Sequence, residues 1–390
     1  MIVKSLEGSK ATLKTEVVSI LESYQRVWNL TKQLDWTTIQ ILKVIEKLGP
    51  RNLLAVARRT KIPFSTVYNR IGKLEATNGP ISFAYLDASK LGLVPFCMLT
   101  SARPGRETAV TEALKIPKYW RLVSRCEGGY SHDSVHYVPF KHVKTFQQYL
   151  KELVNSGLVS KNTLLRVGNY VPNQINYDYY DPRTKRWTFC WDTWLKHLMR
   201  QRATGTIEDP MSYEIKVDKR DLEILRQLQN DGRKSFAKLA KSLGITLQAV
   251  KYRFDHKLTR GGIIGGFGLN SFPCPPEVAA YYELLCEFPS KNMMNKLFSF
   301  VGNLFFVMGV RKVIKRNSLM IRVVIIDSQA LHLFRFLSEL CKKHILTSYS
   351  TVRLRLDARE LQPLRVELFD DTAGWTADYR KWVSDLKKLN

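Results

Sequence analysis

Acidic residues are scarce in this sequence. It has 35 Asp and Glu against 61 Lys and Arg, which gives a formal net charge of +26. Such an imbalance creates a positive field that attracts polyanions and weakens as salt is added. The composition therefore favours a nucleic acid as the partner, with an acidic membrane surface as the less favoured alternative.

Cysteine patterns and long apolar runs are lacking as well. The six cysteines include no C-x-x-C pair, which argues against a disulfide framework or a zinc site. No apolar run approaches the roughly 18 residues that a membrane span needs. Residues 1–20 carry charges where a signal peptide needs an apolar stretch. We therefore expect a cytoplasmic protein with reduced thiols and no membrane segment.

Catalytic fingerprints are also missing. The sequence has no P-loop, no nucleophile elbow and no dinucleotide-binding glycine motif. The one metal-like group is His132, Asp133 and His136, in which the two histidines would share one face of a strand, but a third ligand is not evident. We therefore expect no catalytic residues, no metal and no cofactor.

A helix–turn–helix pattern is the clearest feature that the sequence does contain. It is centred on "LAKSLGITLQAVKYRF", where Leu239 and Leu243 lie at helical spacing on one apolar face. Gly244 predicts a turn, and Thr246 can cap the helix that follows. Two short helices around a glycine turn, after a supporting helix, form a unit that reads DNA. The stretch "RGGIIGGFGLN" behind them predicts a wing.

The same pattern occurs earlier, around "VARRTKIPFSTVYNRI". The two copies align without a gap, and matches such as Val67 with Val250 fall at inward and turn positions. Matches at these positions are what a duplicated fold would retain. The first copy departs from the pattern at two places, because Lys61 replaces the turn glycine and Pro63 replaces the capping threonine.

Both copies carry side chains that suit contact with DNA. The expected phosphate contacts are basic residues in or near the helix pair: Arg58, Arg59, Lys61, Arg70, Lys73, Lys238, Lys241, Lys251 and Arg253. The expected base contacts project away from the apolar anchors: Ser65, Thr66, Asn69 and Lys73 in the first copy, and Gln248, Tyr252 and His256 in the second. Because the two sets differ, we expect two unlike half-sites.

Each copy is followed by the same order of elements, β-α-β-β-α-β. This order is ferredoxin-like and places both helices on one face of an antiparallel sheet. We therefore predict an α+β protein in which two winged helix–turn–helix domains alternate with two ferredoxin-like domains in a tandem repeat. The open sheet faces need cover, so we expect them to pack on each other as an internal pseudo-dimer.

Domain boundaries follow from this repeat. An aromatic segment follows each ferredoxin-like unit, and we expect its tryptophans, such as Trp187 and Trp375, to pack in the core. The predicted divisions are an N-terminal helical extension at 1–33, winged helix–turn–helix domains at 34–90 and 213–272, ferredoxin-like domains at 91–175 and 273–358, an aromatic extension and linker at 176–212, and a C-terminal aromatic extension at 359–390.

These features resemble the Lrp/AsnC (feast/famine) family of transcription regulators, in a tandemly duplicated, archaeal-like form. The stretch "LAKSLGITLQAVKYRF" is close to the family's LAxxLGxSxxxVxxRI, and "EGGYSHDSVHYV" resembles the G-D-Y strand turn of its ligand-binding domain. The resemblance implies double-stranded DNA as partner and an amino-acid effector near that turn. It assigns Gly128, Gly129 and Tyr130 to the effector site, whereas the second copy lacks the pattern.

We therefore predict a sequence-specific DNA-binding transcription regulator that is not an enzyme and whose two units read two half-sites. Because the family often forms rings, higher homo-oligomers are compatible with this prediction. One alternative is a nucleoid-type architectural protein that binds DNA with little sequence preference. Another is a sirohaem decarboxylase-like enzyme, because the two different subunits of those enzymes look like the same winged-helix and ferredoxin-like architecture.

Overall fold

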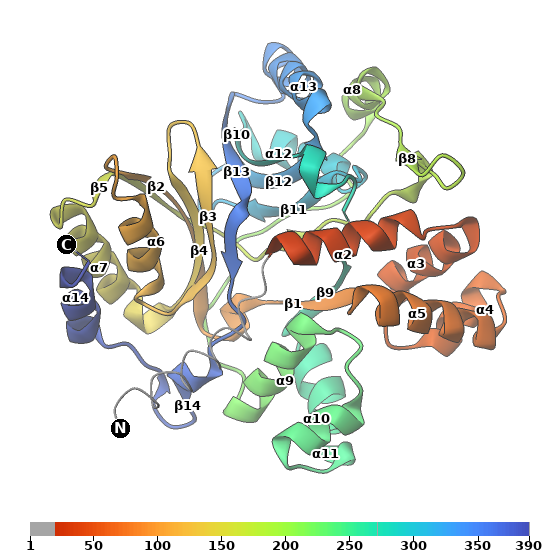
Figure 1. The fold of residues 1–390 in the computed structure, drawn as a ribbon, viewed down its shortest axis with the longest axis horizontal. Coiled ribbons are helices and arrows are strands. Elements are labelled where there is room, and N and C mark those ends of the chain that lie inside the picture. Colours follow the sequence, from red (N-terminus) through yellow and green to blue (C-terminus); the bar gives the residue numbers. More distant parts are fainter. Residues whose placement is uncertain (1–19, 271, 390) are drawn as a thin grey trace.

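The computed structural model describes residues 20–270 and 272–389. A large antiparallel sheet lies beside two small helical units (Figure 1), so the predicted α+β class is confirmed. Most of the predicted N-terminal extension, residues 1–19, lies outside the described residues. Among the helices that the structure describes, none has the length and apolar character needed to cross a membrane.

The large sheet has nine strands in the order β5-β2-β4-β3-β13-β10-β12-β11-β6. Strands β2 to β5 form the first half-sheet, and strands β10 to β13 form the second. The bounds are β2 Leu93–Ala102, β3 Trp120–Glu127, β4 His132–Pro139, β5 Val159–Arg166, β6 Val171–Pro172, β10 Ala279–Glu287, β11 Val307–Lys312, β12 Ser318–Ile326 and β13 Ser348–Leu361.

The two ends of this sheet meet, because β5 and β6 follow each other directly in the chain. Strand β6 pairs with β11, and a bridge between Val167 and Val313 continues this pairing toward β5. In the middle of the order, β3 pairs with β13, for example through Ser124 and Arg359. The two half-sheets therefore adjoin along two seams, and the sheet closes on itself.

Helices cover the outer face of each half-sheet, and the inner faces contact each other. Cys97 and Leu122 of the first half-sheet pack with Met320 of the second, and Leu99 packs with Tyr281. The two half-sheets thus cover each other's apolar faces within one chain. The covering helices are α6 Glu107–Lys115 and α7 Val143–Asn155 on the first half-sheet, and α12 Lys291–Val301 and α13 Ala330–Lys342 on the second.

Two three-helix units flank the sheet, and a strand follows each. The first unit is preceded by helix α2, Ile20–Lys32. Strands β1 and β9 pair with each other, with Ser82 opposite Leu269, and so tie the units together. The bounds are α3 Trp36–Leu48, α4 Leu53–Thr60, α5 Phe64–Asn78 and β1 Ser82–Leu86 in the first unit, and α9 Lys219–Asn230, α10 Phe236–Leu243, α11 Leu247–Tyr252 and β9 Ile264–Leu269 in the second.

The turn of the second unit has the geometry that its sequence predicts. Gly244 is left-handed with φ 62°, and the Thr246 hydroxyl accepts a hydrogen bond of 3.1 Å from the Ala249 amide. In the first unit, Lys61 takes the left-handed conformation with φ 59°, and Pro63 provides no side-chain cap. Because a non-glycine residue costs about 1–2 kcal/mol there, the first unit keeps its turn at a local cost.

Arg51 joins the two units directly. Its guanidinium donates hydrogen bonds of 3.0 Å to the carbonyls of Gly232 and Lys234. It also lies 4.1 Å from the ring centroid of Phe236 and 5.0 Å from that of Phe254. Burial lowers its pKa to about 10, which leaves it charged at neutral pH. Through Arg51 and the β1–β9 pairing, the two units contact each other directly and form one block.

Each aromatic extension packs beside the other half-sheet, not beside the half-sheet that directly precedes it in the chain. Trp194 in α8 packs on Phe305 and Phe306 beside the second half-sheet, whereas Trp382 in α14 packs on Tyr119 and Tyr149 beside the first. The expected core role of these tryptophans is confirmed by their burial. The bounds are β7 Tyr180–Asp181, β8 Arg186–Trp187 and α8 Trp191–Arg200, and β14 Phe369–Asp370, β15 Gly374–Trp375 and α14 Tyr379–Lys387.

Replacing Trp375 by alanine tests the packing of the C-terminal aromatic extension beside the first half-sheet. The side chain is 1% exposed, and its indole N–H donates a hydrogen bond of 2.7 Å to the Leu91 carbonyl. We expect Trp375→Ala to lower the free energy of unfolding by about 3–5 kcal/mol in urea denaturation. Trp36→Ala is the control, because Trp36 is 57% exposed and its loss should change stability by no more than about 0.5 kcal/mol. Equal effects of the two variants would contradict the packing.

Candidate functional site

A cavity of about 740 Å³ lies between the closed sheet and the helix–turn–helix block. Strands β3, β4 and β10 to β13 form one wall, while α2, β1 and the end of α9 form the other. Among the described lining residues there is no carboxylate, but there are six arginines: Arg26, Arg121, Arg226, Arg311, Arg322 and Arg359. The lining is therefore rich in cations, although Arg226 pairs with Glu223 at 2.8 Å.

Arg322 is neutralised by two buried carboxylates. Its guanidinium donates to Asp133 of the first half-sheet at 2.8 Å and to Glu283 of the second. Burial raises the pKa of Asp133 to about 6, because the charged form loses its hydration, although the guanidinium of Arg322 opposes the rise. This cluster links the half-sheets, and Arg322 is its one member that lines the cavity.

Three other arginines of the wall have no carboxylate partner among the described residues. Arg311 is 7% exposed and Arg359 is 9% exposed, and each stacks on a tyrosine ring, at 4.6 Å from the centroid of Tyr170 and 4.7 Å from that of Tyr281. One guanidinium nitrogen of Arg121, Arg311 and Arg359 has no hydrogen-bond partner. Unpaired charges away from water cost several kcal/mol, so an anion in the cavity would relieve this cost.

Aromatic rings also line the cavity. Five of the lining residues are tyrosines: Tyr24, Tyr85, Tyr137, Tyr170 and Tyr281. Burial raises the pKa of Tyr24 and of Tyr170, so both phenols remain neutral O–H donors at physiological pH. Rings with polar tips suit a ligand that is flat and also carries polar groups. The lining as a whole therefore fits a large planar anion.

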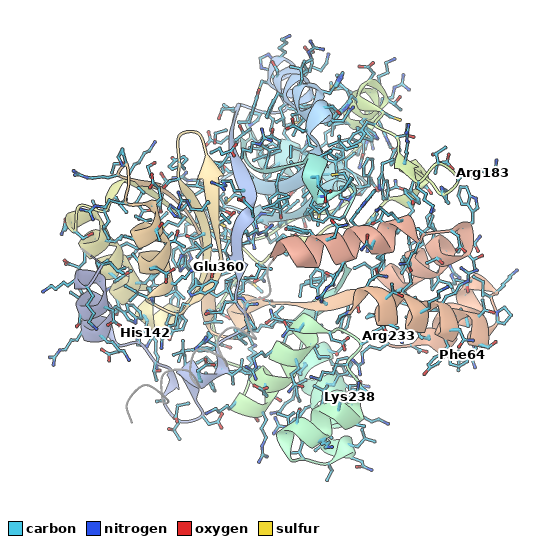
Figure 2. All side chains as sticks on the ribbon, in the orientation of Figure 1. Phe64, His142, Arg183, Arg233, Lys238 and Glu360 are labelled. Atoms are coloured by element: carbon cyan, nitrogen blue, oxygen red, sulfur yellow. The ribbon has the colours of Figure 1, made fainter. Side chains whose placement is uncertain are left out.

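The predicted DNA contacts of the second unit lie outside this cavity, on α10, on α11 and on the π-helical segment Arg253–Thr259 that follows α11. Lys238, Lys241, Gln248, Lys251, Tyr252 and His256 are all exposed, and Lys238 projects from the unit in Figure 2. Arg253 is bound by Asp218 and Asp221 at 2.6 Å each. It therefore fastens α11 to α9.

In the first unit, too, most of the predicted DNA contacts are exposed and one arginine forms an internal ion pair. Arg58, Arg59, Lys61, Ser65, Asn69 and Lys73 are exposed, and Thr66 is half-buried. Arg70 pairs with the helix-capping carboxylate of Asp35 at 2.6 Å, so it also holds its own unit together. Arg70 and Arg253 therefore each form an ion pair within their own unit, and their expected phosphate contacts stay predictions.

The predicted effector residues lie at the turn between β3 and β4 and do not line the cavity. Gly128 has φ 103°, Gly129 is exposed, and the Tyr130 hydroxyl lies 3.1 Å from that of Thr163. The ammonium of Lys161 lies 5.0 Å from the ring centroid of Tyr130. Nothing in this turn tests whether an effector binds there.

The histidines beside that turn are buried and neutral. Burial lowers the pKa of His132 to about 4 and that of His136 to about 3. His132 is hydrogen-bonded to Thr111 and Ser131 at 2.8 Å, and Asp133 points to Arg322. Within residues 20–270 and 272–389, no group of three His, Cys, Asp or Glu side chains could hold a metal ion.

Comparison with known proteins places part of the chain in a family. Residues 217–256 match the model of the AsnC-type helix–turn–helix domain. The second unit is therefore similar to an AsnC-type helix–turn–helix domain. The structure of AsnC from E. coli is 20% identical and covers 35% of this chain and 91% of its own, with a TM-score of 0.25. No curated protein sequence matches the chain.

The whole chain is similar in fold to an enzyme. The siroheme decarboxylase NirDL is 12% identical, and the likeness covers 90% of this chain and 97% of that one with a TM-score of 0.55. A second structure of NirDL, with an iron-uroporphyrin III analogue bound, gives a TM-score of 0.54 over 90% of this chain. The expectation that the chain is not an enzyme is contradicted by this likeness, because the architecture that suggested a regulator also occurs in an enzyme.

The arginines of the cavity were missed in the sequence, although a signal was present. Arg322 stands inside "SLMIRVVII", and Arg311 inside "VMGVRK", so each interrupts an apolar strand. A charged side chain in a strand that is otherwise apolar indicates either an internal ion pair or a ligand site. The sequence cannot tell which, because the carboxylates that pair with Arg322 come from other strands, Glu283 from β10 and Asp133 from β4.

Methionine substitutions distinguish paired from unpaired arginines. We expect Arg311→Met to raise the free energy of unfolding of the ligand-free protein by about 1–3 kcal/mol, since it removes a buried charge without a partner. Arg322→Met should lower it by about 3–5 kcal/mol, because Asp133 and Glu283 would remain buried and unpaired. Urea denaturation measures both, and a loss of stability in Arg311→Met would contradict the assignment.

Proposed function

We propose that the cavity binds a planar tetrapyrrole with several carboxylates and that the chain is a decarboxylase of the siroheme type. The observation that carries this proposal is the set of three arginines without carboxylate partners, the buried Arg311 and Arg359 and the half-buried Arg121, around a cavity of about 740 Å³. A cavity of that size lies in the usual range for small-molecule sites. The full-length likeness in fold to a siroheme decarboxylase supports the same substrate class.

The arginines and the apolar wall have different tasks in this reaction. A carboxylate paired with a guanidinium is stabilised as an anion, so Arg121, Arg311 and Arg359 hold the carboxylates that the product keeps. The carboxylate that leaves must lose its hydration, which favours a position beside apolar side chains such as Phe83 and Leu361.

A proton must replace the carboxyl group that leaves. Breaking the bond to the carboxyl carbon releases CO₂ and leaves the electron pair on the remaining carbon, which then takes a proton. The neutral phenol of Tyr24 is a suitable donor, because its hydroxyl is already hydrogen-bonded to Arg359, whose charge stabilises the phenolate that forms. Solvent then returns the proton to Tyr24.

Titration with siroheme and with iron-uroporphyrin III tests this proposal. We expect both to change the visible absorbance on binding and siroheme to lose CO₂, as followed by mass spectrometry. Arg311→Met and Arg359→Met should each weaken binding about 10- to 100-fold, because each removes one charge-assisted contact. Arg183→Met, an exposed residue remote from the cavity (Figure 2), is the control and should bind as the parent does. An unchanged spectrum with both compounds would refute the proposal.

We also propose that the chain binds duplex DNA through the AsnC-type domain. The match at residues 217–256 and the exposed cations of α10 and α11 support this second function. We infer that the first unit arose as its duplicate and that the closed sheet is an internal pseudo-dimer of two ferredoxin-like units. On this interpretation the chain reads two unlike half-sites, and the turn at 128–130 remains a candidate effector site.

Two substitutions on the second unit separate phosphate contacts from base contacts. Lys241→Ala should weaken binding to all duplexes alike and lower the slope of log affinity against log salt by about 0.9. Gln248→Ala should relax the preference at one base position at a cost of about 1–3 kcal/mol on the matched site. Fluorescence anisotropy between about 50 and 200 mM salt measures both effects. Identical behaviour of the two variants on matched and mismatched sites would contradict the assignment.

A further inference from the structure

Helix α5 exposes two aromatic rings on its first turns. Phe64 is 48% exposed and Tyr68 is 57% exposed, and their ring centroids are 6.0 Å apart with an angle of 35° between the planes. Phe64 lies at the outer edge of the first unit (Figure 2), far from the cavity. No described side chain covers these rings, and they serve neither the core nor the proposed tetrapyrrole site.

The charged side chains of the chain segment around this ring pair are all basic. The segment 53–74 contains no Asp or Glu, and Arg58, Arg59, Lys61 and Lys73 are exposed in it. The nearest carboxylate in the sequence after it, Glu75, is bound by Arg233 at 2.8 Å. An apolar partner protein would gain nothing from these cations, whereas a phosphate backbone would.

The geometry of the rings selects a form of nucleic acid. They lie one helical turn apart with an angle of 35° between their planes, and about half of each side chain is exposed; we call this ring pair the platform. In a duplex, the base faces are covered by neighbouring bases, and a side chain in a groove meets base edges. A ring face finds a base face only where bases are unstacked, as in a single strand.

We propose that the Phe64–Tyr68 platform binds single-stranded nucleic acid by stacking, with the surrounding cations holding the phosphates. The second unit lacks this platform. At the register positions of Phe64 and Tyr68 it has Leu247 and Lys251, and its exposed aromatic pair, Tyr252 and His256, lies later in the helix. Those two rings are 4.8 Å apart and nearly parallel, so they cover each other's inner faces.

The double substitution Phe64→Leu with Tyr68→Lys tests the proposal in the full chain. It installs the residues of the second unit and adds a positive charge, so that weaker binding cannot come from lost electrostatic attraction. Fluorescence anisotropy would compare a labelled mixed-sequence strand with the duplex of the same length at matched salt. We expect the single-strand affinity to fall at least about 5-fold and the duplex affinity to change less.

Lys73→Ala is the matched control, because it removes one phosphate contact and should weaken both nucleic acids to the same extent. Circular dichroism should show unchanged folding, since both rings are exposed; if it does not, Tyr68→Ser alone repeats the test. The proposal is overturned if the parent protein does not bind the single strand, or if the double variant binds it as the parent does. An equal loss for strand and duplex would also overturn it, in favour of groove contact. None of these outcomes depends on tetrapyrrole binding.

Discussion

The pairing of the two half-sheets along two seams is the constraint on which the other features depend. Because β3 pairs with β13 and β6 pairs with β11, the inner faces meet and the strands curve around a common interior. The same closure brings Asp133 of one half-sheet to Arg322 of the other. It also leaves one side of the sheet open toward the helix–turn–helix block, and the arginine cavity lies in that gap.

Charge is distributed in two distinct ways in this molecule. On the helical units it is exposed, where water and salt screen it and where a long polyanion can reach it. In the cavity it is enclosed, where each unpaired guanidinium is costly and where a small polyanion gains most. The net charge of +26 therefore includes exposed and buried cations, and composition alone does not separate them.

The sequence predicted local structure well because local structure depends on neighbouring residues. The cap at Thr246 and the turn at Gly244 follow from spacing within one unit. The cavity could not be predicted, since Arg121, Arg311 and Arg359 come from strands whose order is set by the closure of the sheet. Likewise, Arg253 pairs with Asp221, and the sequence alone does not show which cations are bound in this way.

The crossing of the aromatic extensions has a consequence for biosynthesis. Trp382 packs on Tyr149 of α7 and is translated more than two hundred residues after α7 begins, so this part of the α7 surface stays uncovered until synthesis is almost complete. Contacts between such distant segments slow folding and prolong the exposure of hydrophobic surface. A ribosome that stalls before α14 therefore leaves a product that lacks Trp382 and Leu386 and cannot complete the core around the first half-sheet.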